Sequence, residues 1–124
     1  MRCAAVSIRG MVTINHHRHA ARLTVLIALA IGYLSLSPLE TLPPAPGGDK
    51  LHHLIAYAVL CFLLLFKDAA AARTVLPLAV AYGGLIELVQ PFVNRYGEWG
   101  DFAANAMGCL IGFALARLAQ KFLA

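Results

Sequence analysis

Long apolar runs constrain this chain more than any other feature of its sequence. Four of them follow one another, over about residues 23–39, 50–66, 74–93 and 101–118. Charged residues, or a loop rich in proline and glycine, separate each run from the next. A helix needs about 17–25 mostly apolar residues to cross the hydrocarbon core of a bilayer. The pattern therefore predicts four transmembrane helices.

The composition supports lipid rather than water as the surrounding solvent. Hydrophobic residues make up 60% of the 124 residues and charged residues 13%, against about 45–50% and about 25% in ordinary soluble domains. A chain this small exposes much of its surface, and so few polar groups could not cover it. Intrinsic disorder requires the opposite balance. The net charge of +4 is spread between the apolar runs and not gathered on one face, so we expect no nucleic-acid partner.

These observations predict an all-α fold, a four-helix transmembrane bundle over residues 23–124 that follows a mobile basic tail at residues 1–22. Thr74 is the expected N-cap of the third helix, with Pro77 in its first turn. Cytoplasmic loops carry an excess of Lys and Arg, and a cytoplasmic N-terminus leaves only Lys50 and Arg95 on the outer side. The cytoplasmic side then carries Arg2, Arg9, Arg18, Arg22, Lys67, Arg73, Arg117 and Lys121. Both termini are therefore expected in the cytoplasm.

A cleaved signal peptide is the alternative interpretation of the first apolar run. A charged segment precedes the run, and Ser35-Leu36-Ser37 has the small residues of a cleavage site. The 22 residues before the run are long for such a segment. Removing the run would leave the other three helices in the same orientation.

Polar residues within the apolar runs concentrate at the predicted outer end of each helix. They recur at intervals of three or four residues, which places them on one face of a helix. The candidate polar site consists of Asp49, Lys50, His53, Tyr57, Glu87, Gln90, Arg95, Asp101 and Asn105. Small residues continue these faces more deeply, and the spacing of Gly83, Gly108 and Gly112 predicts close helix packing.

Glu87 is a carboxylate placed deeply within its predicted helix. It lies six positions before Val93, which puts it about 9 Å below the outer end of its helix. A carboxylate at this depth should face the bundle interior and find a partner. His53 and Arg95 are the candidate partners, and a protonated Glu87 is the third alternative.

The ordered set of polar residues resembles the signature of the VanZ family of small polytopic membrane proteins. The resemblance covers residues 49–112 and lies in Asp49, Lys50, His53 and Tyr57, then Glu87, Gln90, Phe92 and Arg95, then Asp101, Asn105, Gly108 and Gly112. The loop at residues 96–100 and the first helix carry none of it. The resemblance implies a multi-pass protein of the bacterial inner (cytoplasmic) membrane. It also implies an accessory role in lowering susceptibility to the glycopeptide teicoplanin, because this is the role of the family's named representative.

Three hypotheses follow for the polar site. It could bind the head group of an envelope lipid or a lipid-linked wall precursor, with Lys50 and Arg95 as cationic groups. It could be structural, with hydrogen bonds and ion pairs that join the helices. It could also be catalytic, since His53, Glu87 and Asp101 can supply acid–base chemistry or hold a divalent metal. No motif supports a particular reaction, so we expect head-group binding without cofactor or metal, and the oligomeric state stays open.

Overall fold

The computed structural model describes residues 3–38 and 48–123, with the helical backbone alone for residues 3–18 and 20. Its main elements are α1 (Cys3–Leu36), α2 (Asp49–Leu65), α3 (Ala72–Val89) and α4 (Trp99–Leu123). Two short 3-10 helices, η2 (Ala69–Ala71) and η3 (Gln90–Val93), flank α3. These ranges contain no strand, so the predicted all-α fold is confirmed.

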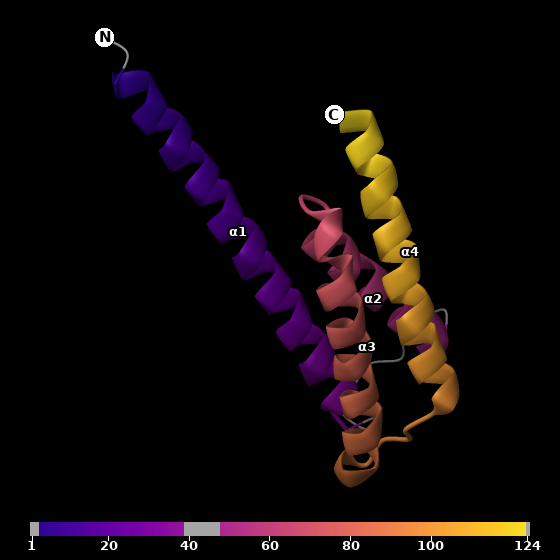
Figure 1. The fold of residues 1–124 in the computed structure, drawn as a ribbon. Helices are drawn as coiled ribbons and strands as arrows, with labels where there is room; N and C mark the ends of the chain where they lie inside the picture. The colour runs from indigo at the N-terminus through magenta and orange to yellow at the C-terminus, as the bar shows by residue number, and fades with distance from the viewer. Residues whose placement is uncertain (1–2, 39–47, 124) are drawn as a thin grey trace.

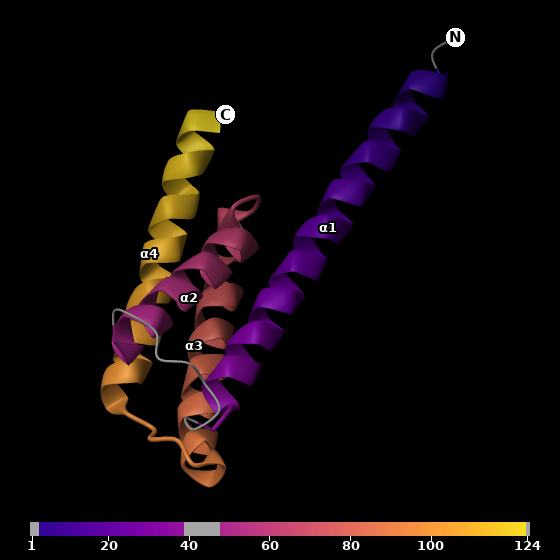
Figure 2. The ribbon, with the colours of Figure 1, turned by 180° about the vertical axis from the view of Figure 1, so that it is seen from behind.

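The helices alternate in direction along the chain (Figures 1 and 2). The start of α1, the end of α4 and the turn between α2 and α3 lie at the upper end of both views. The end of α1, the end of α3 and the start of α4 lie at the lower end, toward which the start of α2 also points. As a result, α2 and α4 run in the same direction, although α3 separates them in the sequence.

Two glycines bring the backbones of α2 and α4 into direct contact. A Cβ atom on Gly108 would collide with the carbonyl oxygen of Leu54, and one on Gly112 would collide with that of Ala58. Only glycine leaves room for this approach, which is the role of GxxxG spacing between membrane helices. The contact aligns α2 and α4 residue by residue and fixes which polar side chains meet at their N-terminal ends.

Side-chain hydrogen bonds to the backbone of α1 attach this helix to α3 and η3. The Tyr82 hydroxyl donates to the carbonyl oxygen of Ala28 at 2.6 Å, and Gln90 Nε2 donates to that of Ser35 at 3.1 Å. Between these contacts α1 adds one side chain to a core shared by all four helices. The buried members of this core are Ile31, Tyr57, Leu60, Cys61, Ala79, Ile86 and Cys109.

Several helix boundaries differ from the predicted ones. α1 begins at Cys3 and not near residue 23, because the preceding segment contains no proline and extending a formed helix costs little. The mobility of residues 1–22 stays a prediction. The expected N-cap at Thr74 is wrong, since α3 begins at Ala72 and continues from η2, where the Asp68 side chain accepts a hydrogen bond from the Ala70 amide at 3.0 Å.

Large apolar side chains make up much of the exposed surface of the helices. Ala69–Val93 and Trp99–Leu123 are both 25 residues long with a mean hydropathy of 1.5, long and apolar enough to cross a membrane, whereas the apolar helical stretch Ala21–Leu36 is shorter. Large aliphatic side chains such as Leu29, Ile55, Leu88 and Leu110 are at least half exposed. Soluble monomers rarely expose apolar surface on this scale, so these faces are suited to contact with lipid.

Candidate functional site

The polar residues singled out in the sequence come together at the lower end of the bundle. α2, α3 and α4 each bring polar side chains to this end. Asp49 and Lys50 are exposed and form the outer rim. The remaining seven are buried: His53, Tyr57, Glu87, Gln90, Arg95, Asp101 and Asn105.

His53 occupies the centre of this polar cluster. Its Nδ1 lies 2.9 Å from Asn105 Oδ1, which joins α2 to α4 by a buried hydrogen bond. An amide oxygen can only accept, so Nδ1–H is the donor. The same nitrogen lies 3.9 Å from Glu87 Oε1, and Nε2 lies 3.8 Å from Asp101 Oδ2. Both carboxylates are therefore beyond hydrogen-bond range of the imidazole.

Lys50 connects the rim to the buried cluster. Its Nζ donates to Glu98 Oε2 at 2.6 Å and lies 3.4 Å from Asp101 Oδ1. The hydrogen bond from Lys50, together with its positive charge, holds the pKa of Glu98 below its usual value. A second ion pair joins Nη2 of the buried Arg95 to Oδ2 of Asp49 at the rim, at 3.7 Å.

Glu98 is a site residue that the sequence analysis missed. Asn94 ends η3 in the left-handed conformation, with φ 58° and ψ 40°, and this reverses the chain toward α4. Gly97 then passes so close to the Glu87 backbone that a Cβ atom would collide with its carbonyl oxygen. This path brings the Glu98 amide to Glu87 Oε2 at 3.1 Å. The only signal in the sequence was an acidic residue three positions before Asp101.

This geometry decides between the partners considered for Glu87. Arg95 pairs with Asp49 and not with Glu87. His53 is close, at 3.9 Å, but not hydrogen-bonded to it. The hydrogen bond comes from the backbone amide of Glu98, a donor that no side-chain pattern could reveal.

Tyr57 and Gln90 lie apart from the ion pairs. The Tyr57 ring packs 6.4 Å from that of Tyr82, centroid to centroid. Gly83 faces both Tyr57 and Asn105, and a Cβ atom there would lie only 2.9 Å from Asn105 Nδ2. Gln90 turns toward α1 and donates to the backbone at Ser35. The candidate site thus has a charged centre, a deeper neutral layer and an extension toward α1.

Several buried polar atoms of this cluster have no hydrogen-bond partner among the residues that the structure describes. These atoms are Tyr57 Oη, Glu87 Oε1, Gln90 Oε1, Asp101 Oδ1 and Asn105 Nδ2. Three of the five are oxygens of carboxylate or amide groups and can act as acceptors. Leaving such a group unsatisfied costs about 1–3 kcal/mol, so the cluster is suited to a ligand that supplies donors or a positive charge.

Apolar helices that enclose ionisable side chains at one end define a helical membrane protein with an internal polar site. Comparison with protein families identifies the family of this membrane protein. The sequence model of the VanZ/LLP1 family matches residues 7–120, and the chain belongs to this family. The match extends to the first helix, which carried none of the residues on which the resemblance was based. No curated protein matches the chain, and no solved structure matches it.

Proposed function

We propose that this protein is a four-span protein of the bacterial inner membrane that binds the head group of an envelope lipid, or of a lipid-linked wall precursor, in its polar cluster. The observation that carries the proposal is the set of buried polar atoms that have no hydrogen bond to any described residue, because a cluster that served only to join the helices would satisfy its own hydrogen bonds. Acceptors at Glu87 and Gln90 without a hydrogen bond, and Asp101 Oδ1 with only the ion pair to Lys50 at 3.4 Å, favour a head group that donates through several hydroxyl or amino groups.

The proposed topology places this cluster at the outer face. In the fold, the start of α1, the end of α4 and the turn after α2 share one end of the bundle (Figure 1), and that end contains Lys67, Arg73, Arg117 and Lys121. The bias of Lys and Arg toward cytoplasmic loops supports a cytoplasmic position for this end. The polar cluster then lies near the outer leaflet, where lipid head groups can reach it from the rim.

The rim favours hydroxyl groups over a bare phosphate. Lys50 and Arg95 already pair with Glu98 and Asp49, so an incoming phosphate would have to displace an acidic partner from each cation. Hydroxyl donors require no such displacement. In the experiment below, we therefore expect the protein to retain a sugar-bearing or glycerol-rich lipid in preference to simple anionic phospholipids.

Native mass spectrometry of the protein with co-extracted lipid tests the proposal. We expect the wild type to retain a specific hydroxyl-rich envelope lipid, and the double variant Glu87→Gln, Arg95→Gln to lose it. The matched control is Asp68→Asn, Lys121→Gln, which removes one acid and one base at the other end of the bundle and should retain the lipid. If wild type and the site variant bind the same bulk phospholipids, and the folded site variant melts earlier, the cluster is structural.

Family membership supports a cellular role in glycopeptide susceptibility. We expect expression of the wild-type protein to raise the teicoplanin concentration that inhibits a sensitive bacterium. The Glu87→Gln, Arg95→Gln variant, at equal membrane abundance, should lose this effect. An unchanged inhibitory concentration with wild-type protein would exclude the role in that host.

A further inference from the structure

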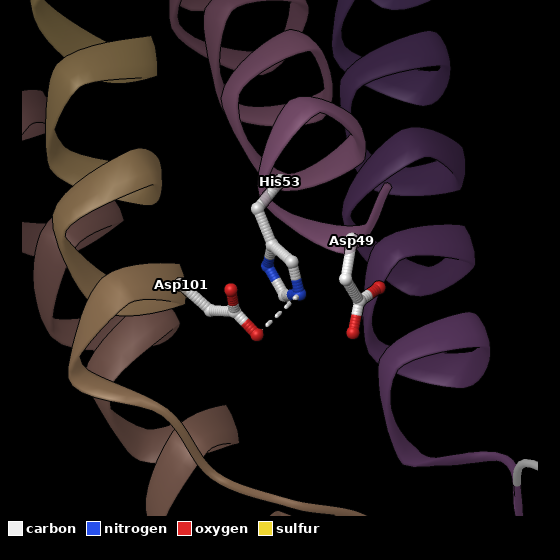
Figure 3. A group of neighbouring side chains, drawn as sticks. All are labelled: Asp49, His53 and Asp101. Atoms are coloured by element: carbon white, nitrogen blue, oxygen red, sulfur yellow. Dashed lines mark ion pairs between the residues drawn. The ribbon is translucent and has the colours of Figure 1, made fainter. Parts of the chain in front are cut away.

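Three ligand-bearing side chains of the polar cluster surround one small volume. Asp49, His53 and Asp101 each place a nitrogen or oxygen atom so that these three atoms lie within 4.8 Å of one another. Figure 3 shows the edge of the imidazole directed into the space between the two carboxylates. Two of the residues come from successive turns of α2 and the third from the first turn of α4.

The hydrogen bond to Asn105 determines what His53 presents to this space. Because Nδ1–H donates to Asn105 Oδ1 at 2.9 Å, the neutral imidazole carries its free lone pair on Nε2. That nitrogen lies 3.8 Å from Asp101 Oδ2, so a lone pair faces a carboxylate. Histidines that bind metals typically have this arrangement, in which the second ring nitrogen is held by an oxygen acceptor.

The surrounding charges leave an excess of negative charge. Within the part of the chain that the structure describes, four carboxylates, from Asp49, Glu87, Glu98 and Asp101, have only Lys50 and Arg95 as Lys or Arg partners. Asp101 is 1% exposed, and its cationic partner, Lys50 Nζ at 3.4 Å from Oδ1, is shared with Glu98. A buried carboxylate in a membrane protein needs a compensating charge.

From these observations we infer that Asp49, His53 and Asp101 bind one divalent first-row metal ion, with Zn²⁺ as the test ion. Imidazole suits Zn²⁺ and its neighbours, and carboxylates complete a mixed nitrogen–oxygen set. Ligand atoms about 2.1 Å from Zn²⁺ lie about 3.4 Å apart in a tetrahedral site. The 3.8 Å between His53 and Asp101 is near this value, and the exposed Asp49 side chain can rotate inward to complete the set.

Lys50 and Arg95 each contact one carboxylate oxygen of the inferred metal ligands. Lys50 contacts Oδ1 of Asp101, whereas Oδ2 of the same residue faces His53. Arg95 contacts Oδ2 of Asp49. Each carboxylate can therefore keep its cationic partner and still offer its other oxygen to the metal. Three protein ligands leave a coordination position open, which distinguishes the site from a closed structural zinc site.

Isothermal titration of the detergent-purified protein with Zn²⁺, after treatment with a chelator, tests this inference. The N-terminal histidines His16, His17 and His19 are first replaced by alanine, and the affinity tag contains no histidine, so that neither competes for the metal. We expect one equivalent to bind per chain. Co²⁺ should bind at the same stoichiometry and give visible absorption bands that Zn²⁺ displaces.

Variants assign the binding to the three residues. We expect His53→Gln, Asp101→Asn and the exposed Asp49→Asn each to weaken Zn²⁺ binding by more than the roughly 10–100-fold that an outer-shell change costs. His52→Gln is the matched control and should bind as the wild type does. Asn105→Ala keeps the three ligands but removes the acceptor for Nδ1–H, and it should weaken binding by about 10–100-fold.

Two results would overturn the inference. One is the absence of saturable Zn²⁺ binding by the folded protein up to about the millimolar range, which corresponds to about −4 kcal/mol of binding free energy. The other is unchanged binding in Asp49→Asn, a substitution at the exposed rim that leaves the buried packing intact. The inference goes beyond head-group binding and does not depend on it, because the titration is carried out without lipid.

Discussion

The glycine contact between α2 and α4 gives a quantitative test of how the site is assembled. In the Gly108→Ala variant, the new methyl group meets the Leu54 carbonyl oxygen and lies 3.1 Å from the Ala58 amide nitrogen. Backbone atoms cannot rotate away, so the helices must separate, and overpacking of this kind costs about 1–3 kcal/mol. Alanine also favours the helix over glycine by about 1 kcal/mol. The expected net loss is about 0–2 kcal/mol of unfolding free energy, centred on about 1 kcal/mol.

Gly84→Ala is the matched control. Its methyl group would lie 3.2 Å from Cε2 of the Phe102 ring, a side chain that can shift, so the gain in helix propensity should leave stability unchanged or raised by about 1 kcal/mol. The two variants add the same atoms to neighbouring helices. They differ in whether the new methyl group meets backbone or a movable ring.

Thiol reactivity during heating measures the difference. Cys61 and Cys109 are free and buried in the core, so a fluorogenic maleimide labels them only when the bundle opens, provided that Cys3 has been replaced by serine. In small soluble domains 1 kcal/mol corresponds to about 4–8 °C in Tm, so the central expected loss of about 1 kcal/mol puts the Tm of Gly108→Ala about 4–8 °C below that of the wild type. A Tm for Gly108→Ala equal to or above that of Gly84→Ala would refute the backbone contact.

Two further predictions concern the rim and the attachment of α1. The pKa of Glu98 is lowered in the folded state by Lys50, so this pair stabilises the protein above the usual pKa of Glu98, and the contribution is lost as the pH falls through the lowered value. Tm measured from pH 7 to pH 3 should therefore fall less steeply in Glu98→Gln than in wild type, and parallel profiles would contradict this. Tyr82→Phe removes the hydrogen bond to Ala28 and should cost about 0.5–1.5 kcal/mol in thermal unfolding, whereas Tyr33→Phe, at an exposed position, should have no effect.

The sequence predicted the helices and the members of the site better than their contacts. Apolar runs and helical spacing suffice to place Asp49, His53, Asp101 and Asn105 at one end of their helices, because such patterns depend only on local geometry. The pairing of Arg95 with Asp49, and of Lys50 with Glu98, depends on how the chain reverses after α3. That reversal follows from the left-handed Asn94 and the close passage of Gly97, which hydrophobic periodicity does not encode.

The start of α1 was missed for a related reason. Hydropathy locates the part of a helix that is suited to lipid, which in α1 is Ala21–Leu36, but backbone hydrogen bonding continues wherever no residue interrupts it. The polar segment before residue 21 contains Gly10 but no proline, so the helix extends to Cys3. The change from polar to apolar sequence near residue 21 therefore marks where the surroundings of the helix are expected to change from water to lipid. It does not mark the start of the helix.

The two proposals for the polar cluster both start from its imbalance of charge and of hydrogen bonding, and different variants test them. Carboxylates outnumber the cations that pair with them, and the unpartnered acceptors outnumber the donors. A hydroxyl-rich head group supplies the missing donors, whereas a metal ion supplies the missing charge. Glu87→Gln changes no residue of the inferred metal set, so it should weaken lipid retention while leaving Zn²⁺ stoichiometry at one. Asp49→Asn removes a metal ligand but none of the unpartnered acceptors, so its larger effect should fall on Zn²⁺ binding.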